Sequence, residues 1–161
     1  MRKTIGPGLA GLLLLGLAAC GVDAKDEAAK DVRDLLVAAQ SGDTEAFEAG
    51  IDREKLKADL RVQVREAARE QGIDIGGPSD ATLDRMIGPD AVRAIQPDPA
   101  AAPPTATQIA EILDVRDKTR ACLRAPGDAD GCALTFEKQG ERWMLIGVQT
   151  SRLELLPGET G

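Results

Sequence analysis

The sequence contains no histidine and no tyrosine among its 161 residues, and its aromatic side chains are limited to one tryptophan and two phenylalanines. Without histidine, the chain lacks the commonest general acid and base, the Ser–His and Cys–His nucleophile pairs, and the usual nitrogen ligand of zinc and haem. Carboxylate chemistry is the one ready enzymatic option that remains. The composition therefore favours a protein that is not an enzyme and that holds no cofactor or metal.

The sequence also lacks an apolar run long enough to cross a bilayer, which takes roughly 20 residues. The run from Leu9 to Leu17 is shorter and is interrupted by glycine. It follows the basic residues Arg2 and Lys3, and small residues come after it. A basic start, a short apolar core and small residues before a cleavage point are the parts of a secretory signal, so we interpret residues 1–19 as a signal peptide.

The four residues Leu-Ala-Ala-Cys that end at Cys20 resemble the lipobox of the bacterial lipoprotein family. The resemblance implies cleavage before Cys20, a diacylglycerol on its sulfur and a fatty acid such as palmitate on its amine. Two or three acyl chains give stable anchoring, because each buried CH2 contributes about 0.8 kcal/mol. The alternative is an ordinary secretory signal in which Cys20 has no special role.

The residue after the lipobox bears on localisation in the cell envelope. In lipoproteins of this kind, aspartate at that position often signals retention in the inner membrane, whereas this chain has Gly21. The resemblance therefore favours the periplasmic face of the outer membrane if the cell has two membranes.

Charge narrows the range of partners. Cleavage removes two basic and no acidic side chains, so the net charge changes from -7 to -9. Such an acidic chain is a poor candidate for binding nucleic acid, and we do not expect its surface to adsorb to anionic lipid. The partners we expect are the membrane, through the lipid on Cys20, and another envelope protein.

Only two cysteines, Cys122 and Cys132, remain besides Cys20. In an oxidising envelope compartment, an even pair at this spacing indicates a disulfide. The alternative is a pair of reduced, buried cysteines in neighbouring strands.

Most of the chain before residue 96 has helical spacing. Apolar residues between Ala28 and Ala39 recur at intervals of three and four, as on one buried helix face. Asp43, Asp52 and either Ser79 or Asp80 are placed to cap later helices. The predicted helices are 24–40, 43–50, 53–71, a short helix after residue 79, and another that begins at Pro89. Residues 20–25 are predicted as a short tether, 26–161 as one domain, and 96–107 as a Pro/Ala linker within it.

The end of the chain predicts strands at 119–124, 132–138 and 142–149. Segment 109–115 fits either a helix turn or an edge strand, and we favour a strand. A two-residue turn at Gln139–Gly140 would pair Phe136 with Trp143 and place Leu134 and Leu145 on the same face. The last strand is apolar on both faces, so we expect it to be interior or covered twice. The predicted fold class is α+β, with N-terminal helices packed on a C-terminal antiparallel sheet of three to four strands.

Three segments, SGDTEAFEAGIDREKLKADL, IGPDAV and FEKQGERWMLIGV, resemble a bacterial domain-of-unknown-function family of small envelope-associated proteins. The resemblance spans roughly residues 32–148. This chain departs from the family pattern in its cysteine pair and in Met144, where a basic residue is common. The family has no assigned activity, so the resemblance supports the fold and implies no function.

One candidate ligand site involves Trp143. If Cys122 lies opposite Cys132, then Arg120 and Arg124 share the face of Trp143. Either a bulge shifts the register, or the arginines border a cavity in which the indole and two guanidiniums bind a small anion or aromatic ligand. The alternative is an ordinary core tryptophan.

Two further candidates are acidic. Glu111, Asp114 and Asp117 could act as acid and base of a hydrolase for envelope glycans, although a solvated acidic face explains them as well. The loop 127–131 has an Asp-x-Asp-Gly core that resembles a calcium loop, but hairpin turn chemistry explains it too. We therefore predict a non-enzymatic protein-interaction module, with a small-ligand-binding domain as the alternative.

Overall fold

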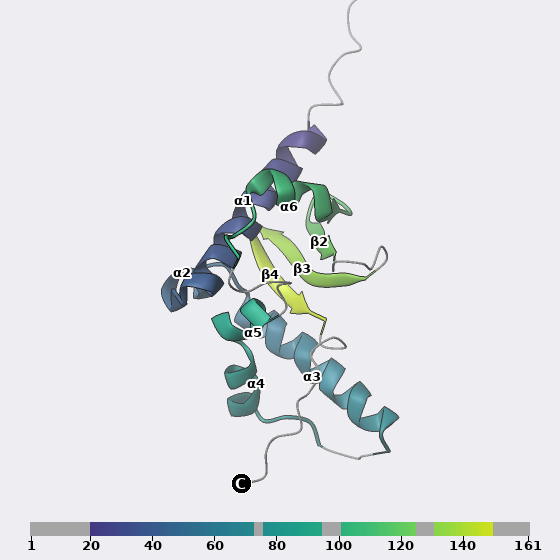
Figure 1. The fold of residues 1–161 in the computed structure, drawn as a ribbon. Coiled ribbons are helices and arrows are strands. Elements are labelled where there is room, and N and C mark those ends of the chain that lie inside the picture. Colours follow the sequence, from purple (N-terminus) through teal and green to yellow (C-terminus); the bar gives the residue numbers. More distant parts are fainter. Residues whose placement is uncertain (1–19, 73–75, 95–100, 125–130, 150–161) are drawn as a thin grey trace, which may run out of the picture.

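The computed structural model describes residues 20–72, 76–94, 101–124 and 131–149. Helices form the first part of this chain and a four-stranded antiparallel sheet forms the last part, which confirms the predicted α+β fold (Figure 1). The helices are α1 (Cys20–Ser41), α2 (Thr44–Glu48), α3 (Arg53–Glu70), α4 (Asp80–Met86), α5 (Pro89–Ala94) and α6 (Ala106–Ile112). The strands are β1 (Leu113–Val115), β2 (Arg120–Arg124), β3 (Cys132–Gln139) and β4 (Arg142–Val148).

Helix α1 begins earlier than predicted. Residues 20–25, which we expected to form a tether, are its first turns. The predicted stripe from Ala28 to Ala39 is buried, because these side chains lie on the helix face that packs against the sheet and α6. Among the described helices, none is both long enough and apolar enough to cross a membrane.

The helix caps follow the sequence closely. The side chains of Asp43, Asp52 and Ser79 accept hydrogen bonds from backbone N–H groups at the starts of α2, α3 and α4. Thr105 and Gln108 form a reciprocal capping box on α6, which our prediction missed. As a result segment 109–115 is divided: its first half ends α6, and the predicted strand begins only at Leu113.

The turn between β3 and β4 differs from the prediction by one residue. The loop is Gly140–Glu141, and Gln139 pairs with Arg142. Gly140 has φ of 64°, the only positive value in this loop, so glycine occupies the first loop position and not the second. From Phe136 to Gln139 the predicted pairing is therefore wrong by two residues, and Phe136 lies opposite Leu145 instead of Trp143. A register shift between Thr135 and Phe136 then places Leu134 opposite Val148.

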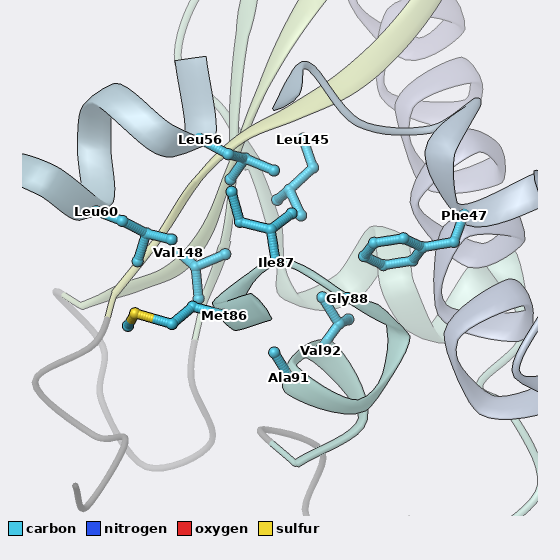
Figure 2. A pocket seen from close by; sticks show the side chains of 10 residues that line it. All are labelled: Phe47, Leu56, Leu60, Met86, Ile87, Gly88, Ala91, Val92, Leu145 and Val148. Atoms are coloured by element: carbon cyan, nitrogen blue, oxygen red, sulfur yellow. The ribbon is translucent and has the colours of Figure 1, made fainter. Parts of the chain in front are cut away.

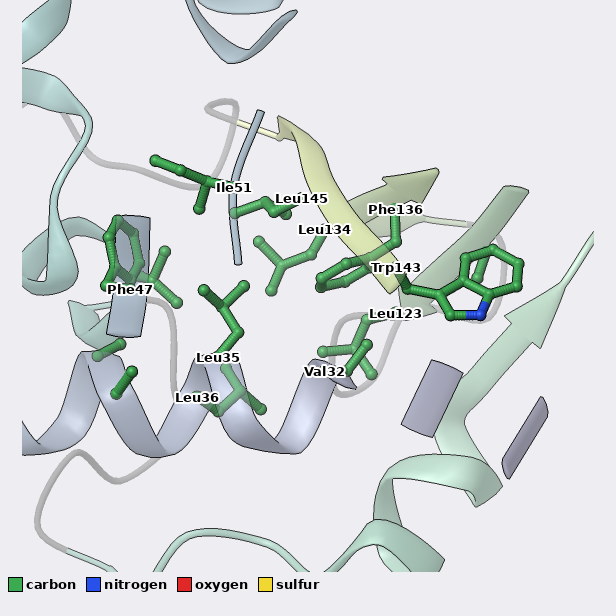
Figure 3. Packing of buried hydrophobic residues seen from close by; sticks show 14 of the residues in the cluster. Val32, Leu35, Leu36, Phe47, Ile51, Leu123, Leu134, Phe136, Trp143 and Leu145 are labelled. Atoms are coloured by element: carbon green, nitrogen blue, oxygen red, sulfur yellow. The ribbon is translucent and has the colours of Figure 1, made fainter. Parts of the chain in front are cut away.

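The predicted inner face of the sheet is still correct for these residues, because side chains alternate with period two and a shift of two positions keeps each one on the same face. Leu134, Phe136, Trp143 and Leu145 are all 1% exposed or less. Figure 3 shows these residues facing Val32 and neighbouring side chains of α1. This inner face of the sheet and the apolar stripe of α1 form the centre of the core.

We expected strand β4 to be interior or covered twice. The strand order is β1-β2-β3-β4, so β4 is an edge strand, and of the two alternatives the interior position is wrong. The segment between α2 and α3 covers its free edge. The Leu145 N–H donates to the Gly50 carbonyl at 2.9 Å, and the Asp52 N–H donates to the Leu145 carbonyl at 2.9 Å. This short parallel bridge gives the edge the backbone partners that a fifth strand would supply.

Two carboxylates complete the cover of the β4 edge. The backbone N–H of Trp143 donates to Asp31 Oδ2 of α1 at 2.8 Å. The Val148 N–H donates to Asp59 Oδ2 of α3 at 3.2 Å. Both helices are thereby joined to the strand through charged acceptors, which form stronger hydrogen bonds than neutral groups do.

We expect Asp31→Ala to lower the free energy of unfolding by about 1–3 kcal/mol, because it removes the acceptor of the Trp143 N–H at a partly buried site. Asp31→Asn keeps an acceptor and should cost less. Chemical denaturation of the three proteins measures the differences.

The matched control is Asp34→Ala, one turn further along α1. Asp34 is exposed and forms an ion pair with Arg33 at 3.2 Å, so its removal should change stability by about 0.5 kcal/mol or less. If Asp31→Ala and Asp34→Ala have the same effect, Asp31 does not secure the edge.

Candidate functional site

Trp143, the centre of the predicted ligand site, lies in the hydrophobic core. The Trp143 side chain is 1% exposed and belongs to the main hydrophobic cluster, next to Phe136 and Leu123 (Figure 3). Its indole Nε1 is buried and has no hydrogen-bond partner among the described residues. The ring is therefore enclosed by apolar side chains and does not present a face to a ligand.

The arginines predicted to join Trp143 lie on the other side of the sheet. Ala121 and Leu123 of β2 are buried on the inner face. Arg120 and Arg124 alternate with them, so their side chains project from the outer face. The structure does not bring Arg120 and Arg124 to Trp143, and the proposed site is wrong for this geometric reason.

The register of β2 and β3 explains why the arginines lie on the outer face. Cys122 and Cys132 are bonded, with their Cα atoms 5.5 Å apart. Cys122 lies opposite Thr135, however, and the register shifts between Leu123 and Arg124, which leaves Ala133 as an extra residue in β3. A bulge therefore resolves the conflict, and it lies at the start of β3. Closing this loop stabilises the fold by about 2–3 kcal/mol in the chain-entropy model.

The three carboxylates predicted as an acid and base have separate positions. Asp117 organises the β1–β2 turn: its Oδ1 accepts from the Thr119 N–H at 2.7 Å, the Thr119 hydroxyl at 2.8 Å and the Arg120 N–H at 2.8 Å. These hydrogen bonds, first of all that from the Thr119 N–H, lower the pKa of Asp117. Glu111 of α6 and Asp114 of β1 are exposed. A general acid needs a raised pKa, so Asp117 is unsuited to that role.

Residues 127–130 of the loop that we compared with a calcium loop lie outside the described residues, so the choice between calcium binding and hairpin turn chemistry stays open. Glu137, an acidic residue that follows this loop in β3, forms an ion pair with Lys55 of α3. Within the described ranges, no group of three or more His, Cys, Asp or Glu side chains is arranged to hold a metal ion.

An apolar cavity of about 30 Å³, which we did not predict, lies among α2, α3, α4, α5 and the end of β4 (Figure 2). Its walls include Phe47, Leu60, Met86, Leu145 and Val148. Ligand pockets are usually about 300–1,000 Å³, roughly ten or more times larger. The cavity therefore accommodates a methyl group or a single small molecule the size of water, and it does not fit a metabolite.

A half-buried carboxylate, Asp59, is the polar feature that the prediction missed. Asp59 Oδ2 accepts from Gln63 Nε2 at 2.7 Å as well as from the Val148 N–H. Gln63 Nε2 also donates to the Val148 carbonyl at 2.8 Å. Burial raises the pKa of Asp59, although its hydrogen bonds oppose the rise. The i,i+4 spacing of Asp59 and Gln63 is visible in the sequence, but their distant partner Val148 is not.

The chain matches no known protein family, no curated protein and no solved structure. The resemblance to a family of small envelope-associated proteins therefore stays a prediction.

We expect Asp59→Asn to become more stable relative to the wild type as pH rises. The raised pKa means that the folded protein binds this proton more tightly than the unfolded chain, whose aspartate titrates near 3.8. Ionisation of Asp59 therefore costs stability, and the cost grows as pH rises from about 3.8 through the higher folded value. Denaturant unfolding across the acidic range measures this dependence.

Asp84→Asn provides a control of opposite sign. The hydrogen bond from Lys57 lowers the pKa of Asp84, so ionised Asp84 favours the folded state. This control should lose stability relative to the wild type as pH rises toward 3.8. A stability difference for Asp59→Asn that stays constant or falls with pH would contradict our account of Asp59.

Proposed function

We propose that this chain is a lipid-anchored protein of the bacterial cell envelope that acts by binding another envelope protein and carries out no catalysis. The observation that carries the proposal is the position of Cys20, which is both the last residue of the lipobox and the first residue of α1. The first buried core residue, Ala28, follows eight residues later. At 1.5 Å per helical residue this is about 12 Å, so a lipid on Cys20 would hold the folded core close to the membrane surface.

A position so close to the membrane suits a protein that meets a partner in or on the same membrane. A long linker, by contrast, would let a domain search a wide volume. Gly21 after the lipobox supports the periplasmic face of the outer membrane as the location if the cell has two membranes.

The absence of histidine and tyrosine from the sequence supports a role other than catalysis. Asp117, one of the three carboxylates considered for catalysis, has its Oδ1 engaged in the β1–β2 turn. Small-ligand binding has less support, because Trp143 is enclosed and the described apolar cavity is only about 30 Å³.

We expect the full chain to fractionate with membranes in a bacterial host and to incorporate a palmitate analogue. Cys20→Ala should abolish both, because it removes the sulfur that carries the lipid. The control Cys122→Ala/Cys132→Ala leaves Cys20 in place and should still be labelled. A Cys20→Ala protein that is labelled and membrane-bound like the wild type would disprove the lipid anchor.

Photo-crosslinking in the membrane tests the protein partner. Among the described residues, Val62 and Ile112 are the large apolar side chains with high exposure, at 51% and 43%. Because interface cores are apolar, a photoreactive residue at either position should give a discrete protein adduct. Their exposed neighbours Glu66 and Glu111 serve as controls and should give less. The absence of an adduct at all four positions would count against a protein-binding role.

A further inference from the structure

We propose that the end of the fold next to Cys20 binds the headgroups of anionic phospholipids, and that this contact orients the domain on its membrane. The inference rests on the proposed lipid anchor. We define this anchor end as residues 20–30 of α1, the β1–β2 turn (116–120) and the β3–β4 turn (138–142).

Three contacts hold the anchor end together. The Lys138 N–H donates to the Thr119 carbonyl at 2.8 Å, which joins the two turns. Lys138 Nζ forms an ion pair with Glu27 Oε2 of α1 at 2.6 Å. Both turns therefore lie beside the N-terminal half of α1, and Figure 1 shows this half of α1 as the part of the helix nearest the start of the chain.

The anchor end is within electrostatic range of the membrane. Glu27 lies seven residues after Cys20, which corresponds to about 10 Å of helix. The Debye length at physiological ionic strength is about 8 Å. With Cys20 held at the headgroups by its lipid, the charges near Glu27 lie slightly more than one Debye length from the surface along the helix, so their attraction to it is weakened by salt and increases as ionic strength falls.

Charge is distributed unevenly between this end and the rest of the molecule. The anchor end contains seven basic and five acidic side chains, a net charge of +2. The chain from Cys20 onward has a net charge of -9, so everything outside the anchor end carries -11. The overall charge, from which we predicted no surface adsorption to anionic lipid, conceals this polarity.

The basic side chains of the β1–β2 turn are accessible to solvent, whereas its acidic residue, Asp117, is hydrogen-bonded within the turn. Arg116 is 57% exposed and forms a long ion pair with the similarly exposed Asp114 at 3.9 Å. Lys118 and Arg120 are also exposed. Asp117 Oδ1 accepts three hydrogen bonds within the turn. Guanidinium and ammonium groups bind phosphate oxygens through charge-assisted hydrogen bonds, and phospholipid headgroups provide these oxygens at the surface.

The polarity has a mechanical consequence. An anionic surface attracts the anchor end, whereas α2 and α4 carry a net negative charge, so α1 should stand with its first turns toward the bilayer. The acidic body, including α2 and α4, would then face away from the membrane, where a partner can reach it.

Energy transfer from the single tryptophan tests the contact. The disulfide occupies Cys122 and Cys132, so Cys20 is the free thiol in a chain that begins at Cys20, which contains every described residue. We would couple Cys20 to a maleimide phospholipid in vesicles that also contain a dansyl-headgroup lipid. Transfer from Trp143 should be higher on phosphatidylcholine vesicles with added phosphatidylglycerol than on phosphatidylcholine alone. High salt should remove the difference.

Charge reversal identifies the residues responsible. The triple variant Arg116→Glu, Lys118→Glu and Arg120→Glu should lose the response to phosphatidylglycerol. The control triple variant Arg65→Glu, Arg69→Glu and Arg85→Glu makes the same change in net charge at exposed positions on α3 and α4, and should keep the response. Circular dichroism checks that each variant is folded.

Equal transfer on the two kinds of vesicle for the unmodified chain would overturn the inference, whether or not the charge-reversed variants fold. A response retained by the folded Arg116/Lys118/Arg120 variant would overturn it as well. The maleimide link replaces the cellular lipid, so this result does not depend on whether cells modify Cys20. Failure of the contact and failure of the proposed anchor are therefore distinguishable.

Discussion

The free edge of β4 is the constraint on which the rest of the structure depends. A last strand at the edge of a sheet leaves a row of backbone groups without partners, and such edges invite pairing with other chains. This chain satisfies them from three separate elements: a carboxylate of α1, the backbone before α3, and a carboxylate of α3. Each contact joins residues that are roughly 90 or more positions apart in sequence, so the edge connects the N-terminal helices to the C-terminal sheet.

The same contacts place the start of α1. Asp31 is fixed to the Trp143 N–H, and Glu27, one turn earlier, pairs with Lys138. The N-terminal turns of α1 therefore extend past the β3–β4 turn toward Cys20. This geometry makes the membrane proposal specific, because the position of a lipid on Cys20 determines which surface of the domain lies against the bilayer.

Much of the fold could be predicted from local patterns. The buried stripe of α1, the caps at Asp43, Asp52 and Ser79, and the pairing of Cys122 with Cys132 each depend on spacing within a short segment. The alternation of side chains also predicted the inner face of the sheet, since a register slip of two residues leaves the faces unchanged.

The features that could not be predicted depend on long-range contacts. A bulge was one of the two alternatives that the sequence left open, but nothing near Ala133 decides between them or gives its position, and that bulge is the reason why Arg120 and Arg124 lie on the face opposite Trp143. The two apolar faces of β4 suggested a strand that is interior or covered twice, and the cover of its edge by Gly50–Asp52 becomes visible only in three dimensions. The candidate site failed for the same reason: which side chains meet across a sheet is decided by its register.

Amide hydrogen exchange at single-residue resolution tests the central claim about the β4 edge most directly. The informative amides are those of Trp143, Leu145 and Val148, which point away from β3. If Asp31, Gly50 and Asp59 hold them as described, these amides should exchange as slowly as the amides buried between β3 and β4, at a rate set by global unfolding. Rapid exchange at these three positions, beside slow exchange in the rest of the sheet, would show that the edge is open and contradict the account.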